Sequence, residues 1–266
     1  MSLVRTVSRA LKCRVIGAAG VAVFALFGCR NLSAPKSVEV PRKPVPTKTV
    51  DLATAGSISG RVTLAGKPPE LHAIDMSAEP ACAKEYSTPV IAPTVVADAN
   101  GNVANAVVYI KSGVSDYAFR APSEAAKLLQ KGCMYEPHVT ALMVGQNLDV
   151  ANDDQTTHNV FMMSQNNRPS NRSSLPGSEP VVESLVAPEL AIPMKCNVHP
   201  WMKGYVFLFD HPYFAVTHRD GKFELTGLPP GTYTLVAWQE LYGTMEQTVT
   251  VAPQGAVSAD FVFKAQ

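Results

Sequence analysis

The chain lacks a hydrophobic run long enough to span a bilayer as a stable helix, and it lacks an excess of charge of either sign. Its apolar run over residues 15–28 has 14 residues, whereas a membrane-spanning helix needs about 20. The whole chain has 23 basic and 22 acidic residues, a net charge of +1. This balance offers no basic stripe of the kind that binds nucleic acid, so we expect no nucleic-acid partner.

The first residues have the pattern of a secretory signal. Residues 1–14 contain four basic residues and no acidic one, and the short apolar run follows. We therefore predict a signal peptide over residues 1–28, which would leave 19 basic and 22 acidic residues, a net charge of −3. The run ends in LFGC, which resembles the lipobox of bacterial lipoproteins with Cys29 as the acylated residue.

This lipobox resemblance implies a place in the bacterial cell envelope, facing the periplasm. Arg30, standing where an aspartate would signal retention in the inner membrane, implies the outer membrane. A diacylated Cys29 would anchor the chain to the membrane stably, where a single acyl chain would not. Plain cleavage and an uncleaved anchor are the alternatives.

Cysteines are few, and each has a predicted use. With the leader removed and Cys29 acylated, three remain: Cys82, Cys133 and Cys196. In an oxidising compartment this number favours one disulfide and one cysteine with another role. We predict the pair Cys82–Cys133, because Cys196 is flanked by other metal-ligand types. A separate metal site of Cys133 with His138 is the alternative.

The rest of the chain predicts an all-β fold. Residues 29–56 are proline-rich and form a predicted linker. Short β segments bounded by turn residues follow from Ser57 onward. We predict strands within residues 57–66, 105–113, 138–153, 158–163, 181–187 and 204–210. One segment, residues 122–132, predicts a short helix with Ser123 as its N-cap and Gly132 as its stop.

The tail has a DG turn, alternating strands and LPPG. Residues 221–235, GKFELTGLPPGTYTL, resemble the carboxypeptidase regulatory-like (transthyretin-like) β-sandwich. The opening strands that this family implies lie far upstream, as ISGRV and NAVVYI. We therefore predict a split Ig-like sandwich of residues 57–112 with 211–266, around an inserted domain of 113–210. The alternative is a tandem arrangement, 57–210 and then 211–266.

Residues 195–202, KCNVHPWM, place three soft ligand types on one loop: Cys196, His199 and Met202. A type 1 copper site needs two imidazoles, one thiolate and a weak, long thioether. The motif HNV supplies a second imidazole, because His158 lies 38 residues before Cys196, between a polar loop and an apolar strand. Together the two motifs predict a single copper ion as cofactor. Zinc is disfavoured by the thioether and the lone thiolate.

These two motifs resemble the cupredoxins, and the ligand loop is most similar to that of the amicyanins. The resemblance covers roughly residues 135–210 and implies a Greek-key β-sandwich. It implies that His158, Cys196 and His199 are equatorial ligands and that Met202 is axial. Asn159 would tie the two ligand loops together. Pro200 and Trp201 would form an apolar docking patch around an exposed edge of His199.

Structural interpretations compete with this assignment. Cys196 could be an inert core thiol, Met202 core filler, and His199 a turn residue. We expect the other four histidines to be surface or packing residues: His72, His138, His211 and His218.

A single type 1 copper ion has no open coordination position, so we expect an electron carrier and no enzyme. The sequence also has no His-x-His pair, no Cys-x3-Cys and no Cys-x-x-Cys-His, which excludes a trinuclear copper cluster, a dinuclear copper centre and covalent haem. The expected partners are periplasmic redox proteins, a dehydrogenase or a cytochrome, bound transiently. The alternatives are a copper-storage or copper-delivery lipoprotein and a surface-interaction protein with a cupredoxin scaffold.

Overall fold

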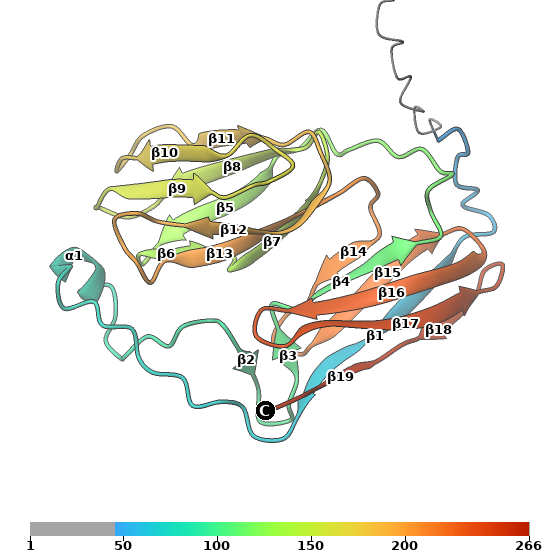
Figure 1. Ribbon diagram of the computed structural model, residues 1–266, viewed down its shortest axis with the longest axis horizontal. Helices are drawn as coiled ribbons and strands as arrows, with labels where there is room; N and C mark the ends of the chain where they lie inside the picture. The colour runs from blue at the N-terminus through green and yellow to red at the C-terminus, as the bar shows by residue number, and fades with distance from the viewer. Residues whose placement is uncertain (1–45, 266) are drawn as a thin grey trace, which may run out of the picture. The chain divides into compact units, whose positions relative to one another are not determined.

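The computed structural model describes residues 46–265, and these confirm the predicted all-β fold (Figure 1). The predicted signal, Cys29 and most of the predicted linker lie outside the described residues. α1 (Pro80–Ala83) is the only helix within residues 46–265. No helix in this part of the chain has the length and hydrophobicity to cross a membrane.

The first sandwich combines strands from both ends of the described chain. Its strands are β1 (Gly56–Ala65), β4 (Val107–Ser112), β14 (Phe214–Val216), β15 (Lys222–Leu228), β16 (Gly231–Gln239), β17 (Gly243–Val251), β18 (Ala256–Ser258) and β19 (Phe261–Lys264). One sheet has the order β15-β1-β18, with β19 also paired to β1, and the other has the order β14-β4-β16-β17. Residues 56–112 and 214–264 therefore share both sheets and one hydrophobic core.

β1 shows why these residues form a tightly packed strand. Its side chains alternate between buried and more exposed positions, with Ile58, Val62 and Leu64 in the core. Gly60 is required by the close approach of the neighbouring chain, because a Cβ there would lie 2.0 Å from the carbonyl oxygen of Ala259. β1 pairs with β15 along one edge and with β18 and β19 along the other. All three partner strands come from the C-terminal part of the chain.

The second sandwich lies between β4 and β14 in the chain. Its strands are β5 (Ala126–Lys131), β6 (Met134–Glu136), β7 (Val139–Met143), β8 (Asn147–Asn152), β9 (His158–Met162), β10 (Ser170–Ser174), β11 (Val181–Ser184), β12 (Glu189–Lys195) and β13 (Lys203–Phe209). The two sheets have the orders β10-β9-β12-β13-β7 and β11-β8-β5-β6. Their facing side chains form a separate core. The predicted copper ligands lie at the start of β9 and on the loop between β12 and β13.

The helix predicted over residues 122–132 is wrong, because this segment forms β5. β5 pairs in parallel with β8, with Leu128 opposite Val150, and antiparallel with β6. Leu128 and Gln130 are buried while their neighbours are more exposed, which is the period of a strand. Pairing on both sides outweighs the helical preference of alanine, leucine and lysine.

Gly132, predicted to stop that helix, instead begins the tight turn between β5 and β6. Gly132 and Cys133 both have a positive φ, 58° and 56°, as a two-residue hairpin turn of type I′ requires. Glycine adopts this conformation freely, but Cys133 needs support from its surroundings.

A long connection between β1 and β2 (Val96–Ala97) leaves the first sandwich and returns to it through a hairpin with β3 (Val103–Ala104). We call residues 71–91 of this connection the cap segment. The cap segment contains α1, which Figure 1 draws beside the second sandwich. A disulfide between Cys82 and Cys133 joins the cap segment to the β5–β6 turn. The Tyr86 hydroxyl also donates a hydrogen bond to the carbonyl of Gly132 at 2.9 Å.

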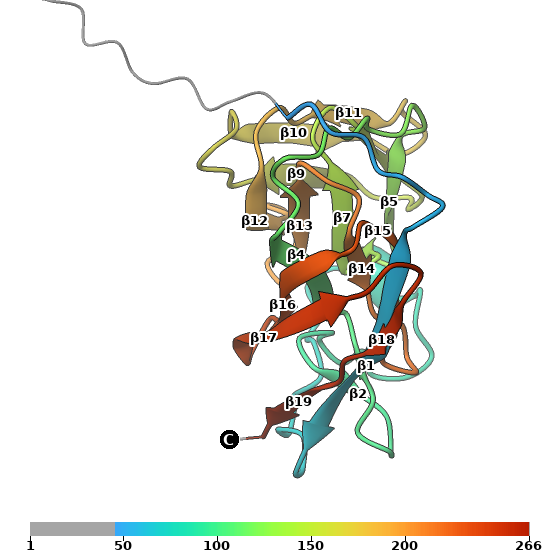
Figure 2. The same ribbon diagram turned by 90° about the vertical axis from the view of Figure 1, so that its right-hand side faces the viewer.

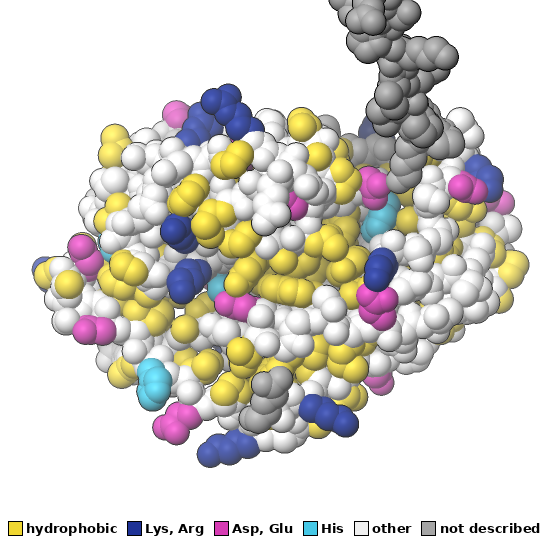
Figure 3. All heavy atoms as spheres, viewed as in Figure 1, with side chains coloured by type: hydrophobic (Ala, Val, Ile, Leu, Met, Phe, Trp, Pro, Cys, Tyr) yellow, Lys and Arg dark blue, Asp and Glu magenta, His cyan; other side chains and the backbone are white. Residues whose placement is uncertain are grey.

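The two sandwiches meet through an aromatic and aliphatic cluster formed by β4, β7, β13 and β16. Phe207 and Trp238 lie with ring centroids 4.8 Å apart across this junction. His138 adds a polar link, with Nε2 2.7 Å from Glu240 and Nδ1 3.1 Å from the carbonyl of Lys203. Figures 1 and 2 show the two sandwiches with β4, β7, β13 and β16 labelled, and Figure 3, viewed as Figure 1, shows hydrophobic side chains gathered on the face turned to the viewer.

Candidate metal centre

Three predicted ligands converge in the core of the second sandwich. His158 begins β9, and Cys196 and His199 lie on the loop between β12 and β13. The Nδ1 atoms of the two histidines lie 3.0 Å apart, and Cys196 Sγ lies 3.7 Å from His199 Nδ1. The ligand atoms of all three residues lie within 4.8 Å of one another. All three side chains are buried, as a rigid site shielded from water requires.

The ligand loop closes on itself. The N–H of Cys196 donates to the carbonyl of Met202, and the N–H of Met202 donates to the carbonyl of His199, both at 3.0 Å. Met202 is fully buried in the same core as Cys196. The loop therefore fixes the backbone of the predicted axial residue through bonds to both Cys196 and His199.

The surroundings of Cys196 favour the thiolate form of its side chain. Burial alone would raise the pKa of its thiol, but a hydrogen bond with His158 and the backbone N–H groups of His199, Val198 and Asn159 lower this pKa below its ordinary value. These three N–H groups lie 3.3–3.4 Å from Sγ. Since the thiolate is the form that binds metals, the loop backbone favours the ligating state.

Asp154 is a functional residue that the sequence analysis missed. Its buried carboxylate accepts hydrogen bonds from Nε2 of His158 and from the N–H groups of Gly132 and Cys133, each at 2.7 Å. Burial would raise the pKa of Asp154, but these hydrogen bonds hold it below its ordinary value. Burial lowers the pKa of His158, but hydrogen bonds with Asp154 and Cys196 raise it above its ordinary value. When His158 loses one proton, the ionised Asp154 keeps the remaining proton on Nε2, so Nδ1 offers a lone pair to a metal. The signal in the sequence was a carboxylate four residues before the histidine.

His199 is held in the neutral form. Burial, and then the charge of His158, lower its pKa below the ordinary value. Its Nδ1 faces His158 and Cys196, whereas its Nε2 has no hydrogen-bond partner among residues 46–265. Neutral imidazole is the ligand form of histidine, so this environment also suits metal binding.

Asn159 lies between the two ligand loops, where the resemblance placed it. Its Oδ1 accepts the N–H of Asn197 at 3.4 Å, and its Nδ2 donates to Oδ1 of Asn171 and to the carbonyl of Arg172. Its own N–H points at Cys196 Sγ. Asn159 therefore connects β9 and β10 to the ligand loop.

The expectation of an exposed His199 edge is wrong. His199 is fully buried, and the ring of Trp201 lies 5.3 Å from its ring, centroid to centroid. Trp201 is only partly exposed, because its indole N–H donates to the carbonyl of Cys133 and its ring packs on the cluster around the disulfide. Pro200 is exposed, and Val198 on the same loop is 45% exposed. The cap segment, which comes from far upstream in the chain, accounts for this burial.

The other histidines and cysteines of residues 46–265 have structural partners or face solvent. The alternative site of Cys133 with His138 is not formed, because Cys133 is in the disulfide and His138 bonds Glu240 and Lys203. His211 is buried, and its Nε2 donates to the carbonyl of Ile110, 2.9 Å away. His72 and His218 are exposed.

The donor set fits copper. Two imidazole nitrogens and one thiolate, with a buried thioether residue on the same loop, match the ligand types of a type 1 copper site. A structural zinc site would use more thiolates or imidazoles and no methionine. The tautomer imposed by Asp154 and the N–H groups around Cys196 fit this set as well.

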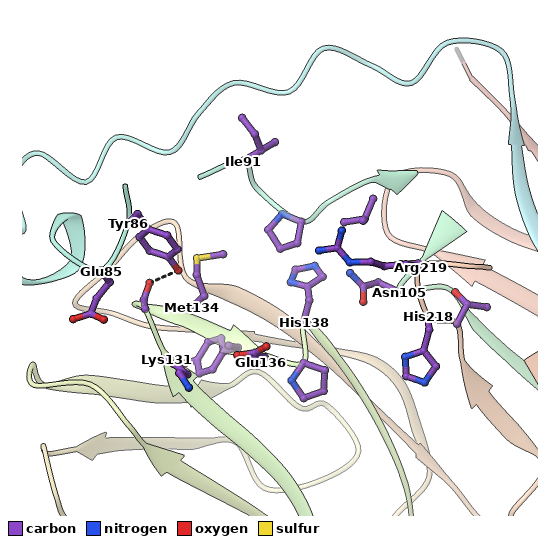
Figure 4. Close-up of a pocket in the computed structure, with 17 residues that line it drawn as sticks. Glu85, Tyr86, Ile91, Asn105, Lys131, Met134, Glu136, His138, His218 and Arg219 are labelled. Carbon is purple, nitrogen blue, oxygen red and sulfur yellow. Dashed lines mark hydrogen bonds between the residues drawn. The ribbon is translucent and has the colours of Figure 1, made fainter. Parts of the chain in front are cut away.

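A separate cleft of about 710 Å³ lies on the other side of the β5–β6 turn (Figure 4). The residues that line it include Tyr86, Lys131, Glu136, His138, His218 and Arg219. None of the four predicted copper ligands lines this cleft. It is therefore distinct from the metal centre, although the cap segment forms part of its wall.

The family model of the carboxypeptidase regulatory-like domain matches residues 206–264. A search of curated proteins finds no match to the chain.

Solved structures similar to the chain include several copper proteins. A Cu-containing nitrite reductase from Thermus scotoductus SA-01 is 20% identical with a TM-score of 0.31, over 38% of this chain and 25% of that one. The chain thus spans about a quarter of the reductase. A purple cupredoxin from Nitrosopumilus maritimus is 20% identical with a TM-score of 0.27, over 31% and 98%. A methionine-to-alanine mutant of amicyanin, in the Cu(I) form, is 17% identical with a TM-score of 0.28, over 38% and 97%.

Proposed function

We propose that the chain is a type 1 copper protein that carries single electrons and turns over no substrate. His158, Cys196 and His199 would hold the ion, with Met202 as the weak axial ligand. Bound copper would supply a one-electron couple between Cu(II) and Cu(I). The observation that carries the proposal is the convergence of two Nδ1 atoms and one Sγ atom in a buried pocket.

The surroundings of these atoms support electron transfer because they hold the ligands in place. Asp154 fixes His158 from one side, and three backbone N–H groups surround the sulfur of Cys196 from the other. Hydrogen bonds to a ligand sulfur and the burial of the site tune the reduction potential of type 1 copper. Ligands fixed in this way move little when the charge of the ion changes.

The surface beside Cys196 offers a place for a partner protein. A hollow of about 540 Å³ is lined by Cys196, Asn197 and Pro200, and by the two lysines Lys195 and Lys203. Apolar Pro200 together with two cations suits a partner that offers an apolar surface and acidic side chains. Small, transient contacts are typical of redox partners.

The cellular setting completes the proposal. Acylated at Cys29 and tethered by residues 29–56, the chain would stand on the periplasmic side of the outer membrane. Its partners would then be a periplasmic dehydrogenase as donor and a cytochrome as acceptor. The lipobox resemblance supports the anchor, and the absence of a substrate position at a four-ligand site supports the role of a carrier.

A redox cycle tests the proposed function. The Cu(II)-loaded protein should have an intense visible band that one electron equivalent of a chemical reductant removes and one equivalent of oxidant restores. Repetition over several cycles without loss of copper supports electron transfer. Copper that leaves the protein on reduction, or a Cu(II) form without the band, contradicts it.

A second function, copper storage or delivery, is favoured by one observation: His199 is buried beneath the cap segment. An exposed histidine edge would serve electron entry, and here that edge is covered. Under this alternative the Cu(I) form should pass its ion to an acceptor with competing thiolates faster than it exchanges electrons with a cytochrome. The two rates, measured on the same preparation, separate the two functions.

A further inference from the structure

We propose that Cys82, Cys133 and His199 form a second metal site, selective for Cu(I), when the disulfide between the two cysteines is reduced. This site is separate from the type 1 site, because it does not use Cys196, His158 or Met202. It shares only the imidazole ring of His199, through the other nitrogen.

The three ligand residues already lie together. The Sγ atoms of Cys82 and Cys133 and a ring nitrogen of His199 lie within 4.8 Å of one another. Their exposed fractions are 0%, 1% and 0%. Two thiolates and one imidazole at this separation are enough to surround a small ion, and no rearrangement of the fold is needed to bring them within reach.

His199 has a second ring nitrogen that the type 1 site does not use. Its Nδ1 is directed at His158 and Cys196. Its Nε2 is buried and has no hydrogen-bond partner among residues 46–265. A buried polar atom without a partner is uncommon and needs an explanation. A metal ion held by the two neighbouring thiolates would give Nε2 that partner.

The surroundings of the disulfide select a soft ion. Met76 lies in the same buried cluster as the two cysteines, and Met134 and Trp201 pack against it. Thiolate and thioether groups prefer Cu(I), whereas hard cations need oxygen ligands and water. Two thioethers, an indole and two thiolates in an apolar cluster therefore favour Cu(I) over magnesium or calcium.

The redox step balances with a dithiol as reductant. A dithiol protein or reagent gives two electrons and two protons to the Cys82–Cys133 bond, and it becomes a disulfide itself. With the type 1 site filled, His199 also gives up its Nε2 proton, so binding of one Cu(I) to the two thiols and Nε2 releases three protons and leaves a dithiolate complex in which the His199 imidazolate bridges the two ions. Reoxidation of the cysteines would expel the ion. The state of the disulfide thus decides whether the second site exists.

The cap segment gives access to this site. Apart from the disulfide, this segment is held by a short helix, a few backbone bonds such as Ile74 N–H to the carbonyl of Val90, and the hydrogen bond from Tyr86 to Gly132. A hollow of about 470 Å³ is lined by Ile74, Met76, Tyr86 and Val90, all of which pack in the cluster of the disulfide. A dithiol and then Cu(I) can approach from this hollow.

Counting Cu(I) per chain tests the proposal. The purified protein would be titrated anaerobically with Cu(I) against a chromogenic chelator, once with the disulfide intact and once after reduction by a phosphine and its removal. The reduced form should bind one Cu(I) more than the oxidised form. The double variant Cys82→Ser/Cys133→Ser should bind the same number in both conditions, and Ala83→Ser, next to Cys82 on the exposed side of the segment, should behave as the wild type.

Two further measurements keep the test decisive if the double variant fails to fold. In the reduced wild type, Cu(I) should protect Cys82 and Cys133 from alkylation, as read by peptide mass spectrometry. Reduced Cys196→Ser, which removes the type 1 thiolate, should show the same protection, so failure of the type 1 assignment would not mask the second site. Equal Cu(I) counts in the two redox states of the wild type, or alkylation unaffected by Cu(I), overturn the proposal.

Discussion

The carboxylate of Asp154 accepts the Nε2 proton of His158 at 2.7 Å, four residues further along the chain. The same carboxylate accepts hydrogen bonds from the N–H groups of both turn residues between β5 and β6, Gly132 and Cys133. One buried side chain therefore orients a predicted copper ligand and supports the turn that carries the disulfide.

Asp154→Asn is expected to weaken copper binding about 10- to 100-fold, the usual cost of losing the group that orients a ligand histidine. An asparagine amide cannot accept from three donors as a carboxylate does, so His158 would lose its fixed tautomer. Competition with a copper chelator measures the change. The matched control is Asp153→Asn, one residue earlier and exposed, which should bind copper as the wild type does. Equal affinity in both variants would remove Asp154 from the site.

Asn159→Ala is expected to release copper faster and to lower the free energy of unfolding by about 1–3 kcal/mol, because buried partners lose their hydrogen bonds. The lost bonds are those with Asn171, Arg172 and the N–H of Asn197. Transfer of copper to a chelator and a denaturant titration measure the two effects. Asn197→Ala keeps the backbone bond to Asn159 and should show a smaller effect on both. An off-rate unchanged in Asn159→Ala would contradict its role between the loops.

His138→Ala is expected to destabilise the junction of the two sandwiches by about 2 kcal/mol, since it removes a hydrogen bond to a charged partner and another to a carbonyl. The partners are Glu240 at 2.7 Å and the carbonyl of Lys203 at 3.1 Å. Thermal unfolding measures the change, while the visible copper band should stay. His72→Ala, on an exposed histidine, is the control. A copper band lost together with the stability would mean that His138 belongs to the metal centre after all.

Glu189 should give the protein a pH-dependent stability. Burial would raise the pKa of Glu189, but hydrogen bonds from Ser164, Gln165, Asn166 and Asn167 lower it below its ordinary value. Because the pKa is lower in the folded state, Glu189 stabilises the fold above the unfolded-state value, near 4.5, and loses this effect as the pH falls through the folded-state pKa. Glu189→Gln should therefore be less stable than the wild type at pH 7, by about 1 kcal/mol.

Below the folded-state pKa of Glu189 the wild type and Glu189→Gln should unfold at nearly the same temperature. Glu179→Gln, on an exposed carboxylate, is the matched control and should follow the wild type at every pH. A difference between wild type and Glu189→Gln that does not shrink as the pH is lowered would contradict the assignment of this group.

Much of the fold could be predicted from local patterns. Alternating side chains indicated β1, apolar segments bounded by turn residues indicated β4 and β13, and Gly145 and Gln146 separated β7 from β8. β5 was mispredicted because its helix formers are overruled by pairing with β8, which lies about 20 residues further along the chain. The helix propensity of a segment contains no information about the strand with which that segment pairs in the fold.

The candidate site, too, could be predicted from the sequence only in part. Cys196 and His199 share one short loop, and His158 has its own motif, so local spacing was sufficient to find them. The burial of His199 was not predictable, because it depends on a cap segment about 110 residues upstream and on contacts such as Trp201 with Cys133. The assignment of the copper ligands stays a prediction.

The most direct test of the central claim is a titration of the metal-free protein with Cu(II), followed by visible absorption. We predict an intense thiolate-to-copper band that saturates at one equivalent, requires Cys196 and is lost in Cys196→Ser. The Asn197→Ser variant, beside Cys196 but not among the ligands, should keep the band. A wild-type protein that binds Cu(II) without this band, or a band that persists in Cys196→Ser, would contradict a type 1 copper site at His158, Cys196 and His199.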